Sequence, residues 1–182
     1  MIELSNSGHS DVAYRLLLQT TYPSWGYMID HGATTMWERW NGDQMMGDPS
    51  MNSYNHYAYG AVAEWLYRYA AGIDETAENP GFHRLVLHPQ FDAALGAAKA
   101  TYDSSYGPIT SNWKADGNTI SWDVVIPPNT SGLLYFPGDV TSTILEGGKD
   151  IRQSSAISFV LRDDRNAVYE AGAGTYSFTV RH

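Results

Sequence analysis

The sequence predicts an α+β protein, with helices in residues 1–76 and an antiparallel, jelly-roll-like β-sandwich in residues 77–182. Three observations predict this class. First, 43% of the 182 residues are hydrophobic and only 17% are charged, which is typical of a chain that folds around a core. Second, apolar residues recur at helical spacing before residue 76. Third, later residues form short apolar runs between turn signals. We therefore expect a domain boundary near residue 76.

Two helices are expected in the first part. The first runs from Asp11 to Gln19 after a Ser10 cap, and its apolar stripe consists of Val12, Leu16 and Leu17. The second runs from Tyr54 to Ala71 without a Pro and ends at Gly72, a residue favoured just beyond a helix. Because apolar and aromatic residues cover every face of this second helix, we expect it to be buried on all sides. That burial requires partner helices that the chain does not supply.

Eight short strands are expected in the second part. Turn residues such as Gly107-Pro108, Asp116-Gly117-Asn118 and Pro127-Pro128-Asn129 separate them, at the spacing typical of an antiparallel sandwich or jelly roll. The predicted strands are Arg84–His88, Ala98–Asp103, Ile109–Trp113, Thr119–Ile126, Leu133–Phe136, Val140–Leu145, Ala156–Leu161 and Tyr176–Val180.

Charge and composition exclude several classes of protein. Eleven Lys and Arg against 20 Asp and Glu give a net charge of −9, so we expect no nucleic-acid partner. No apolar run approaches the roughly 20 residues of a membrane span, so we expect no membrane partner. The chain has no Cys, and its His residues lack metal-ligand spacing, so neither a metal site nor a cofactor is expected. The localisation is left open.

A carboxylate between two tryptophans, in the segment Trp37-Glu38-Arg39-Trp40, is the first candidate site. Indole faces cover the C–H face of a sugar ring, and a carboxylate handles protons or hydroxyls, so this pattern favours a sugar site. A structural interpretation stays open beside it. Thr35 and Glu38 have the spacing of a capping box, in which Glu38 would only accept an N–H at a helix start.

The second candidate is His56, which is expected in the first turn of the long helix. There it could hydrogen-bond a substrate hydroxyl or a carboxylate, or it could be a core His with its bonds satisfied. Four further acids, Asp30, Asp43, Asp48 and Glu64, are alternative candidates. Positions in a helix or a Gly-rich loop favour surface or loop roles for Asp43, Asp48 and Glu64, and Asp30 is the next candidate for the base if Glu38 is not the base.

These segments resemble the C-terminal part of bacterial α-L-rhamnosidases. The resemblance rests on Pro23–Ile29, Gly32–Trp40 and Asn55–Val62, with Glu64–Arg68 behind them. It is strongest over residues 3–90 and extends into residues 97–113. The catalytic domain of that family is an (α/α)6 barrel followed by a C-terminal β-sandwich. The resemblance thus implies that residues 1–76 are the last helices of such a barrel, which accounts for the missing partner helices, and that residues 77–182 are the sandwich.

The resemblance also implies the chemistry, an inverting hydrolysis of terminal α-L-rhamnosides. Glu38 matches the family's general base, which activates a water, and His56 matches a histidine that lines the rhamnose pocket, with Trp37 or Trp40 as an aromatic wall. The family's general acid lies in an upstream acidic motif that nothing in this chain matches. Because an inverting enzyme needs both carboxyl groups, the isolated chain is expected to be inactive.

Two other functions stay open. The sandwich could be a non-catalytic carbohydrate-binding module that grips sugar with exposed tryptophans, or a purely structural cover for one end of the barrel. In the rhamnosidase interpretation the partners are rhamnose-containing glycosides or oligosaccharides and the missing N-terminal part of the barrel. Helix faces left without that part would expose apolar surface, so self-association of the chain is expected.

Overall fold

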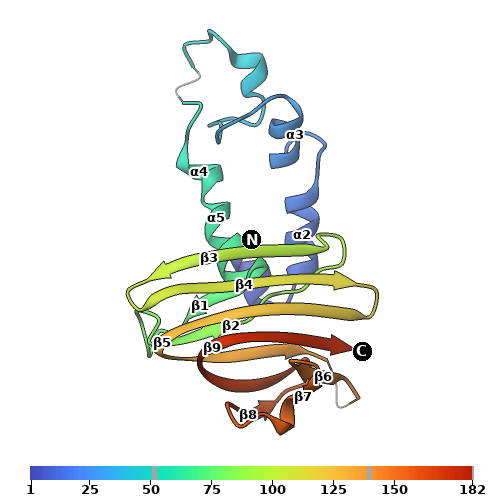
Figure 1. Cartoon of the computed structure of the whole chain (residues 1–182). Coiled ribbons are helices and arrows are strands. Elements are labelled where there is room, and N and C mark those ends of the chain that lie inside the picture. Colours follow the sequence, from blue (N-terminus) through green and yellow to red (C-terminus); the bar gives the residue numbers. More distant parts are fainter. Residues whose placement is uncertain (51–52, 139–140, 182) are drawn as a thin grey trace. The chain divides into compact units, whose positions relative to one another are not determined.

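The computed structural model describes residues 1–50, 53–138 and 141–181 and divides into two compact units, Met1–Trp65 and Leu66–His182 (Figure 1). The first, here called the helical unit, contains short helices and loops, and the second, the sheet unit, is built around strands. The mixed helix and strand content confirms the coarse fold class. The domain boundary near residue 76 stays a prediction, because a division by contacts does not locate the end of an independently folding domain.

The helical unit consists of short segments joined by long loops. Its described elements are α1 (Ile2–Asn6), α2 (Ser10–Leu18), α3 (Trp25–Asp30), the 3-10 turn η1 (Gly42–Met45), α4 (Tyr57–Gly60) and α5 (Val62–Trp65). Its buried apolar side chains are few, and the edge of the Tyr14 ring packs on Trp65 with centroids 5.0 Å apart. The indole N–H of Trp65 donates to the Ser5 hydroxyl at 2.9 Å. These contacts hold α1, α2 and α5 together.

The first predicted helix forms, but its details differ from the prediction. The residue before α2 is His9, without a side-chain cap, and the Ser10 hydroxyl donates instead to the Ser5 hydroxyl at 3.0 Å. The predicted cap is therefore wrong. The predicted apolar stripe is not the face that α2 buries within this chain, because its buried residues are Ala13 and Tyr14 while Leu16 is 44% exposed.

The second predicted helix is shorter and less regular than expected. It begins at Tyr57 and passes through α4 and α5 into η2 (Leu66–Ala70), a π-helical turn that opens the sheet unit. Gly72 follows with φ of 76°, and a Cβ there would lie 2.0 Å from the Pro89 nitrogen, so the predicted glycine stop is confirmed. The helix is not buried on all sides in this chain, since Tyr57 is 83% exposed, as expected for a helix whose partner helices the chain does not supply. Its burial in a longer protein stays a prediction.

Nine described strands join in one hydrogen-bonded sheet of the sheet unit, and the central pair is β5 with β9. The path runs β1-β2-β5-β9-β6-β7, with β4 on β5, β3 on β4, and β8 on β9. The strands are β1 (Ile73–Glu75), β2 (Arg84–Leu87), β3 (Ala97–Ser104), β4 (Gly107–Asp116), β5 (Thr119–Pro137), β6 (Thr143–Glu146), β7 (Lys149–Asp150), β8 (Ile157–Arg162) and β9 (Asn166–Arg181).

Two strands that the sequence separates are one long strand in the structure. The Pro127-Pro128-Asn129 segment does not turn the chain back; β5 runs through it for 19 residues, with a register shift between Ile126 and Ser131. The first part of β5 pairs with β4, and the part after the shift pairs with β2. That last pair is parallel, so the expectation of a wholly antiparallel arrangement is wrong at β2–β5.

Alternation along β5 and β9 builds the core of the sheet unit. Ile120, Trp122, Val124 and Ile126 are buried at every second position of β5, which gives the sheet one buried face there. Trp122 contacts the rings of Phe136 and Phe178 at 5.3 and 5.8 Å. The remaining predicted strands lie within or overlap observed ones, while Val140 of the sixth is outside the described residues.

Buried polar groups in this core are paired. The Ser111 hydroxyl donates to the Ala71 carbonyl at 2.6 Å and accepts the indole N–H of Trp122 at 2.9 Å. The indole N–H of Trp113 donates to the Ala70 carbonyl at 2.7 Å. These bonds fasten the end of η2 to β4. Both tryptophans of the sheet unit are buried, so neither matches the exposed tryptophan expected of a carbohydrate-binding sandwich.

Candidate functional site

The Glu38 segment and the His56 segment lie side by side in the helical unit. The backbone N–H of Glu38 donates to the Ser53 carbonyl at 3.0 Å, and the N–H of His56 donates to the Met36 carbonyl at 2.7 Å. The Thr35 hydroxyl adds a third bond to the Tyr54 carbonyl. Two motifs that stand about twenty residues apart in the sequence are thus held together by main-chain hydrogen bonds.

Glu38 lies in a loop and is half-buried. No helix begins between Thr35 and Glu38, where every residue is described, so the capping-box interpretation is wrong. A backbone bond to Ser53 fixes the position of Glu38 instead. The carboxyl group is therefore not committed to a helix terminus.

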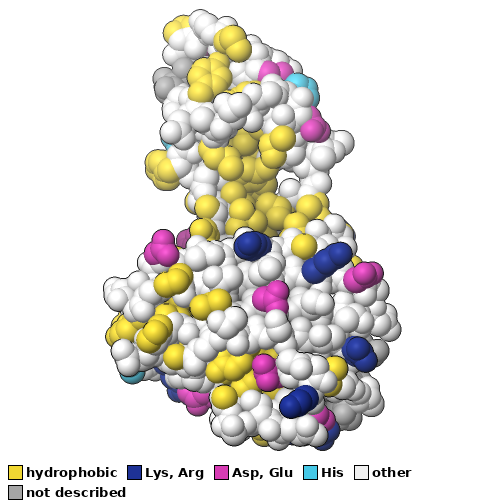
Figure 2. Space-filling view, viewed as in Figure 1, with side chains coloured by type: hydrophobic (Ala, Val, Ile, Leu, Met, Phe, Trp, Pro, Cys, Tyr) yellow, Lys and Arg dark blue, Asp and Glu magenta, His cyan; other side chains and the backbone are white. Residues whose placement is uncertain are grey.

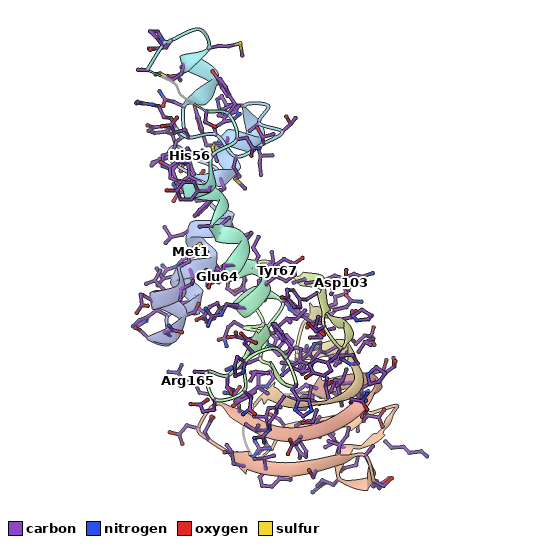
Figure 3. The ribbon with its side chains drawn as sticks, turned by 90° about the vertical axis from the view of Figure 1, so that its left-hand side faces the viewer. Met1, His56, Glu64, Tyr67, Asp103 and Arg165 are labelled. Carbon is purple, nitrogen blue, oxygen red and sulfur yellow. The ribbon has the colours of Figure 1, made fainter. Side chains whose placement is uncertain are left out.

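His56 caps helix α4 rather than standing in its first turn (Figure 3). Its ring Nδ1 accepts the backbone N–H of Ala58 at 3.1 Å, and the ring stacks on Tyr57 with centroids 4.9 Å apart. An imidazole nitrogen that accepts a hydrogen bond carries no proton, so this contact selects the neutral tautomer with its proton on Nε2. The cap thus presents Nε2 as a hydrogen-bond donor.

The two tryptophans that flank Glu38 have different surroundings. Trp37 is 7% exposed, its ring edge meets Tyr54, and Gly42 lies so close that a Cβ there would be 2.6 Å from the ring. Trp40 is half-buried and stacks on Tyr59 at 3.7 Å. Trp37 therefore anchors the loop from inside, and Trp40 leaves more of its indole accessible.

Trp25 and Tyr59 complete an aromatic cluster around Trp40. The ring of Trp25 meets Trp40 edge-on at 5.2 Å, and its indole N–H donates to the Tyr59 carbonyl at 3.0 Å. Sequence reasoning did not single out Trp25 or Tyr59 as site residues. No local pattern distinguished them, because the glycines beside them, Gly26 and Gly60, face the Gln19 carbonyl and the Met36 side chain and not an aromatic ring.

A hollow of about 470 Å³ lies beside the paired segments. Hydrophobic side chains gather on this unit in Figure 2, and the lining of the hollow is largely apolar, with Trp25, Met28, Ile29, Ala33, Thr34, Thr35, Met36 and Asn55. Glu38 and His56 are not among these residues, but each lies within two positions of one that is. The volume falls in the range of about 300–1,000 Å³ typical of small-molecule sites.

The surroundings of the other candidate acids of this unit differ from those of Glu38. Asp30 ends α3 and is exposed, and Asp48 accepts the backbone N–H of Ser50 at 2.8 Å, a bond that lowers the pKa of its carboxyl. Asp43 has a buried Oδ1 without a hydrogen-bond partner among the described residues. The described residues contain no group of three or more His, Cys, Asp and Glu that could hold a metal ion. None of the described helices has the length and apolar character to cross a bilayer.

Comparison with known families assigns both units to one class of enzyme. Residues 1–70 match the bacterial alpha-L-rhamnosidase 6 hairpin glycosidase domain, and residues 72–150 match the bacterial alpha-L-rhamnosidase C-terminal domain. Both domains are found in glycosidases, the class of enzymes also called glycoside hydrolases.

Individual relatives agree with the family models. The alpha-L-rhamnosidase of Streptomyces avermitilis is 41% identical over 97% of this chain, and one from Formosa agariphila is 35% identical over 98%. The crystal structure of the Streptomyces avermitilis enzyme complexed with L-rhamnose superposes on 98% of the chain with a TM-score of 0.83 and 40% identity. The chain spans only 16% and 19% of the two relatives and 17% of that crystallised chain. It belongs to the bacterial α-L-rhamnosidase family and includes that family's C-terminal domain.

Proposed function

We propose that the chain forms part of an inverting α-L-rhamnosidase and supplies its general base. The observation that carries this proposal is the pairing of the Glu38 and His56 segments by backbone hydrogen bonds. Glu38 would deprotonate the water that attacks the anomeric carbon, and His56 would donate from Nε2 to a sugar hydroxyl. Trp40, with Trp37 behind it, would form an aromatic wall against the C–H face of the rhamnose.

The general acid would come from outside this chain. An inverting glycosidase places its two carboxyl groups about 6.5–9.5 Å apart, with a water between one of them and the sugar. No acid of the chain matches the family's acidic motif, so the acid would belong to the remainder of the enzyme. The 182 residues alone should therefore not turn over an aryl rhamnoside.

We also propose the finer architecture. The helical unit would be the last part of an (α/α)6 barrel, consistent with its match to the 6 hairpin domain. The sheet unit would be a two-layered sandwich, in which β5 and β9 pass from one layer to the other at the Ile126/Ser131 register shift. The change of β5 partner from β4 to β2 at this shift supports that arrangement.

The test is the substitution Glu38→Gln in the full-length enzyme. It removes the proton acceptor while keeping the shape, so kcat should fall by about 10²–10⁴-fold with little change in melting temperature. Azide should restore turnover of Glu38→Gln and yield β-rhamnosyl azide, because the small anion takes the place of the attacking water.

Matched variants sharpen this test. Glu3→Gln, an exposed glutamate in α1, should leave kcat unchanged. If Glu38→Gln keeps near wild-type activity and Asp30→Asn loses it, the base is Asp30 and the proposal for Glu38 is wrong.

The remainder of the barrel would also be the partner of the exposed helix faces. Tyr57 and Ile29 are 83% and 68% exposed, and monomeric proteins rarely leave large apolar patches in water. We expect the isolated chain to self-associate and to bind a hydrophobic dye, as measured by light scattering and dye fluorescence. A monomer that binds no dye would contradict this expectation.

The affinity of Glu38→Gln for a rhamnoside distinguishes the carbohydrate-binding alternative from the proposed catalytic function. A binding module would hold a rhamnoside through the sheet unit without Glu38, so Glu38→Gln would not alter its affinity. Its exposed aromatic residues would include Phe159, Tyr102 and Tyr106, which are 58%, 40% and 39% exposed, while both sheet tryptophans are buried.

A further inference from the structure

A second, polar hollow lies in the sheet unit, and its lining contains none of the residues assigned to catalysis. Its volume is about 240 Å³, and β6, β7, η3 (Ile151–Gln153), β8 and β9 all contribute to its lining. Figure 1 shows β6, β7 and β8 gathered at the same end of the sheet unit. The volume is below the roughly 300 Å³ at which drug-sized sites begin, so it suits a ligand the size of one monosaccharide.

The floor of this hollow is apolar and its wall is charged. Ile144 and Ile151, 5% and 2% exposed, belong to the core beneath it. Arg152, Arg162 and Asp150 stand around it and bring two positive charges and one negative charge. The described lining thus has a net charge of +1 in a chain whose net charge is −9. A local excess of guanidinium groups in an acidic protein indicates an anionic ligand.

The charged groups are held in place by the fold. Arg152 donates from Nε and Nη2 to the two carboxylate oxygens of Asp150, at 2.8 and 2.5 Å, and its backbone N–H adds a bond of 2.9 Å. Arg162 donates from Nη1 to the Gly138 carbonyl at 3.0 Å. Both guanidinium groups are therefore preorganised, so little side-chain entropy is lost when a ligand binds.

Tyr169 lies where these groups converge. It is 6% exposed, and its ring packs edge-on against Phe136 and Phe159. Burial raises the pKa of its hydroxyl, while the positive charges of Arg162 and Arg152 act in the opposite direction. The phenol is therefore a neutral hydrogen-bond donor close to both arginines at neutral pH.

The hydrogen-bond donors and acceptors that line the hollow limit the chemical class of the ligand further. A simple anion would find donors in the arginines and Tyr169 but would be repelled by the Asp150 carboxylate. Asp150 already accepts three hydrogen bonds from Arg152, which leaves one acceptor position on Oδ2 for a ligand hydroxyl, and the Thr143 hydroxyl offers one more partner. We propose that this hollow binds a hydroxylated carboxylate of monosaccharide size, namely a hexuronate unit. This binding does not depend on Glu38 or on rhamnoside hydrolysis.

The test is a titration of the ¹⁵N-labelled 182-residue chain with sodium galacturonate, followed by NMR. Saturable shifts are expected at amides of β6, η3, β8 and β9. Methyl galactoside, which lacks the carboxylate, and acetate, which lacks the hydroxyls, are added at the same ionic strength. Each should bind roughly tenfold or more weakly, because each loses one set of charged or hydroxyl contacts.

Variants locate the binding. Arg152→Gln should weaken galacturonate binding by roughly tenfold or more, and Tyr169→Phe, which keeps the ring packing, should weaken it several-fold. Lys114→Gln removes a positive charge at an exposed position of β4, outside the lining of the hollow, and should leave the affinity unchanged. The absence of saturable shifts, equal binding of acetate or methyl galactoside, or an equal loss in Lys114→Gln would each overturn the proposal. Unchanged affinity in Tyr169→Phe with a native melting temperature would overturn the assigned position.

Discussion

The two units differ in how far they bury their aromatic and apolar side chains. In the sheet unit, Trp113 and Trp122 are at most 1% exposed, and both indole N–H groups donate to buried acceptors. In the helical unit, Tyr57 and Ile29 are largely exposed to solvent. The buried hydrophobic cluster lies wholly within the sheet unit. The apolar residues of this cluster pack on one another, while the helical unit leaves large apolar side chains such as Leu16 and Met46 exposed. A unit with its own core can be stable alone, and one without it depends on what covers it.

The largest effect that would test this contrast is expected in the core of the sheet unit. Trp122→Ala removes a ring that contacts Phe136 and Phe178 and leaves a cavity, so the free energy of unfolding should fall by about 3–5 kcal/mol. Urea unfolding followed by far-UV circular dichroism measures it. Trp40→Ala, the same change in the helical unit, should leave this sheet transition in place, and equal losses would mean that the two units unfold as one.

A smaller effect is expected where the helical unit is tightly packed. Gly42→Ala places a Cβ 2.6 Å from the Trp37 ring, so the loop that holds Glu38 should lose about 1–3 kcal/mol of local stability. Hydrogen exchange of residues 33–50 would report faster opening. Gly172→Ala, at a position with open space, is the control and should change nothing. Unaltered exchange in Gly42→Ala would show that Trp37 does not anchor the loop.

The smallest effect concerns pH and the sheet unit alone. Burial lowers the pKa of His88 from its ordinary value of 6.5, although Asp163 and Asp74 act against the shift. The unfolded chain therefore binds this proton at a higher pH than the folded chain, so stability falls as the pH drops from above 6.5 toward the folded pKa.

Comparison with two variants isolates this contribution. His88→Gln should flatten the decline of unfolding free energy between about pH 7.5 and 5.5, whereas His83→Gln, at an exposed histidine, should not. Equal slopes in wild type and His88→Gln would assign the pH dependence to other groups.

Patterns that depend on local chemistry were predictable from the sequence. A short apolar run between turn signals predicted a strand over Thr119–Ile126, and Gly72 predicted the end of the second helix. The proline pair at 127–128 was misleading, because a bulge in a long strand and a turn between two strands use the same residues. The parallel β2–β5 pair joins segments far apart in the sequence, and no local pattern encodes such a partner.

The sequence singled out candidate site residues, but it did not show which contacts hold them in place. The tryptophans around Glu38 and the histidine of Asn55-His56 were recognisable as motifs. Spacing alone could not distinguish a capping box from a loop carboxylate at Glu38, because the deciding bond comes from Ser53, in another segment. The tautomer of His56 depends on the hydrogen bond from the Ala58 N–H. This bond could not be predicted without knowing the residue at which the helix begins.

The position of β9 also constrains how the sheet unit can assemble. This strand pairs with β5 along most of its length and with β6 and β8 at its two ends. Each of those strands has an unpaired edge until residues 166–181 are available. Such non-local pairing raises contact order and slows folding, so a nascent chain would present open strand edges until β9 leaves the ribosome. During that interval the unit would depend on chaperones, or on rapid synthesis, to avoid edge-to-edge aggregation.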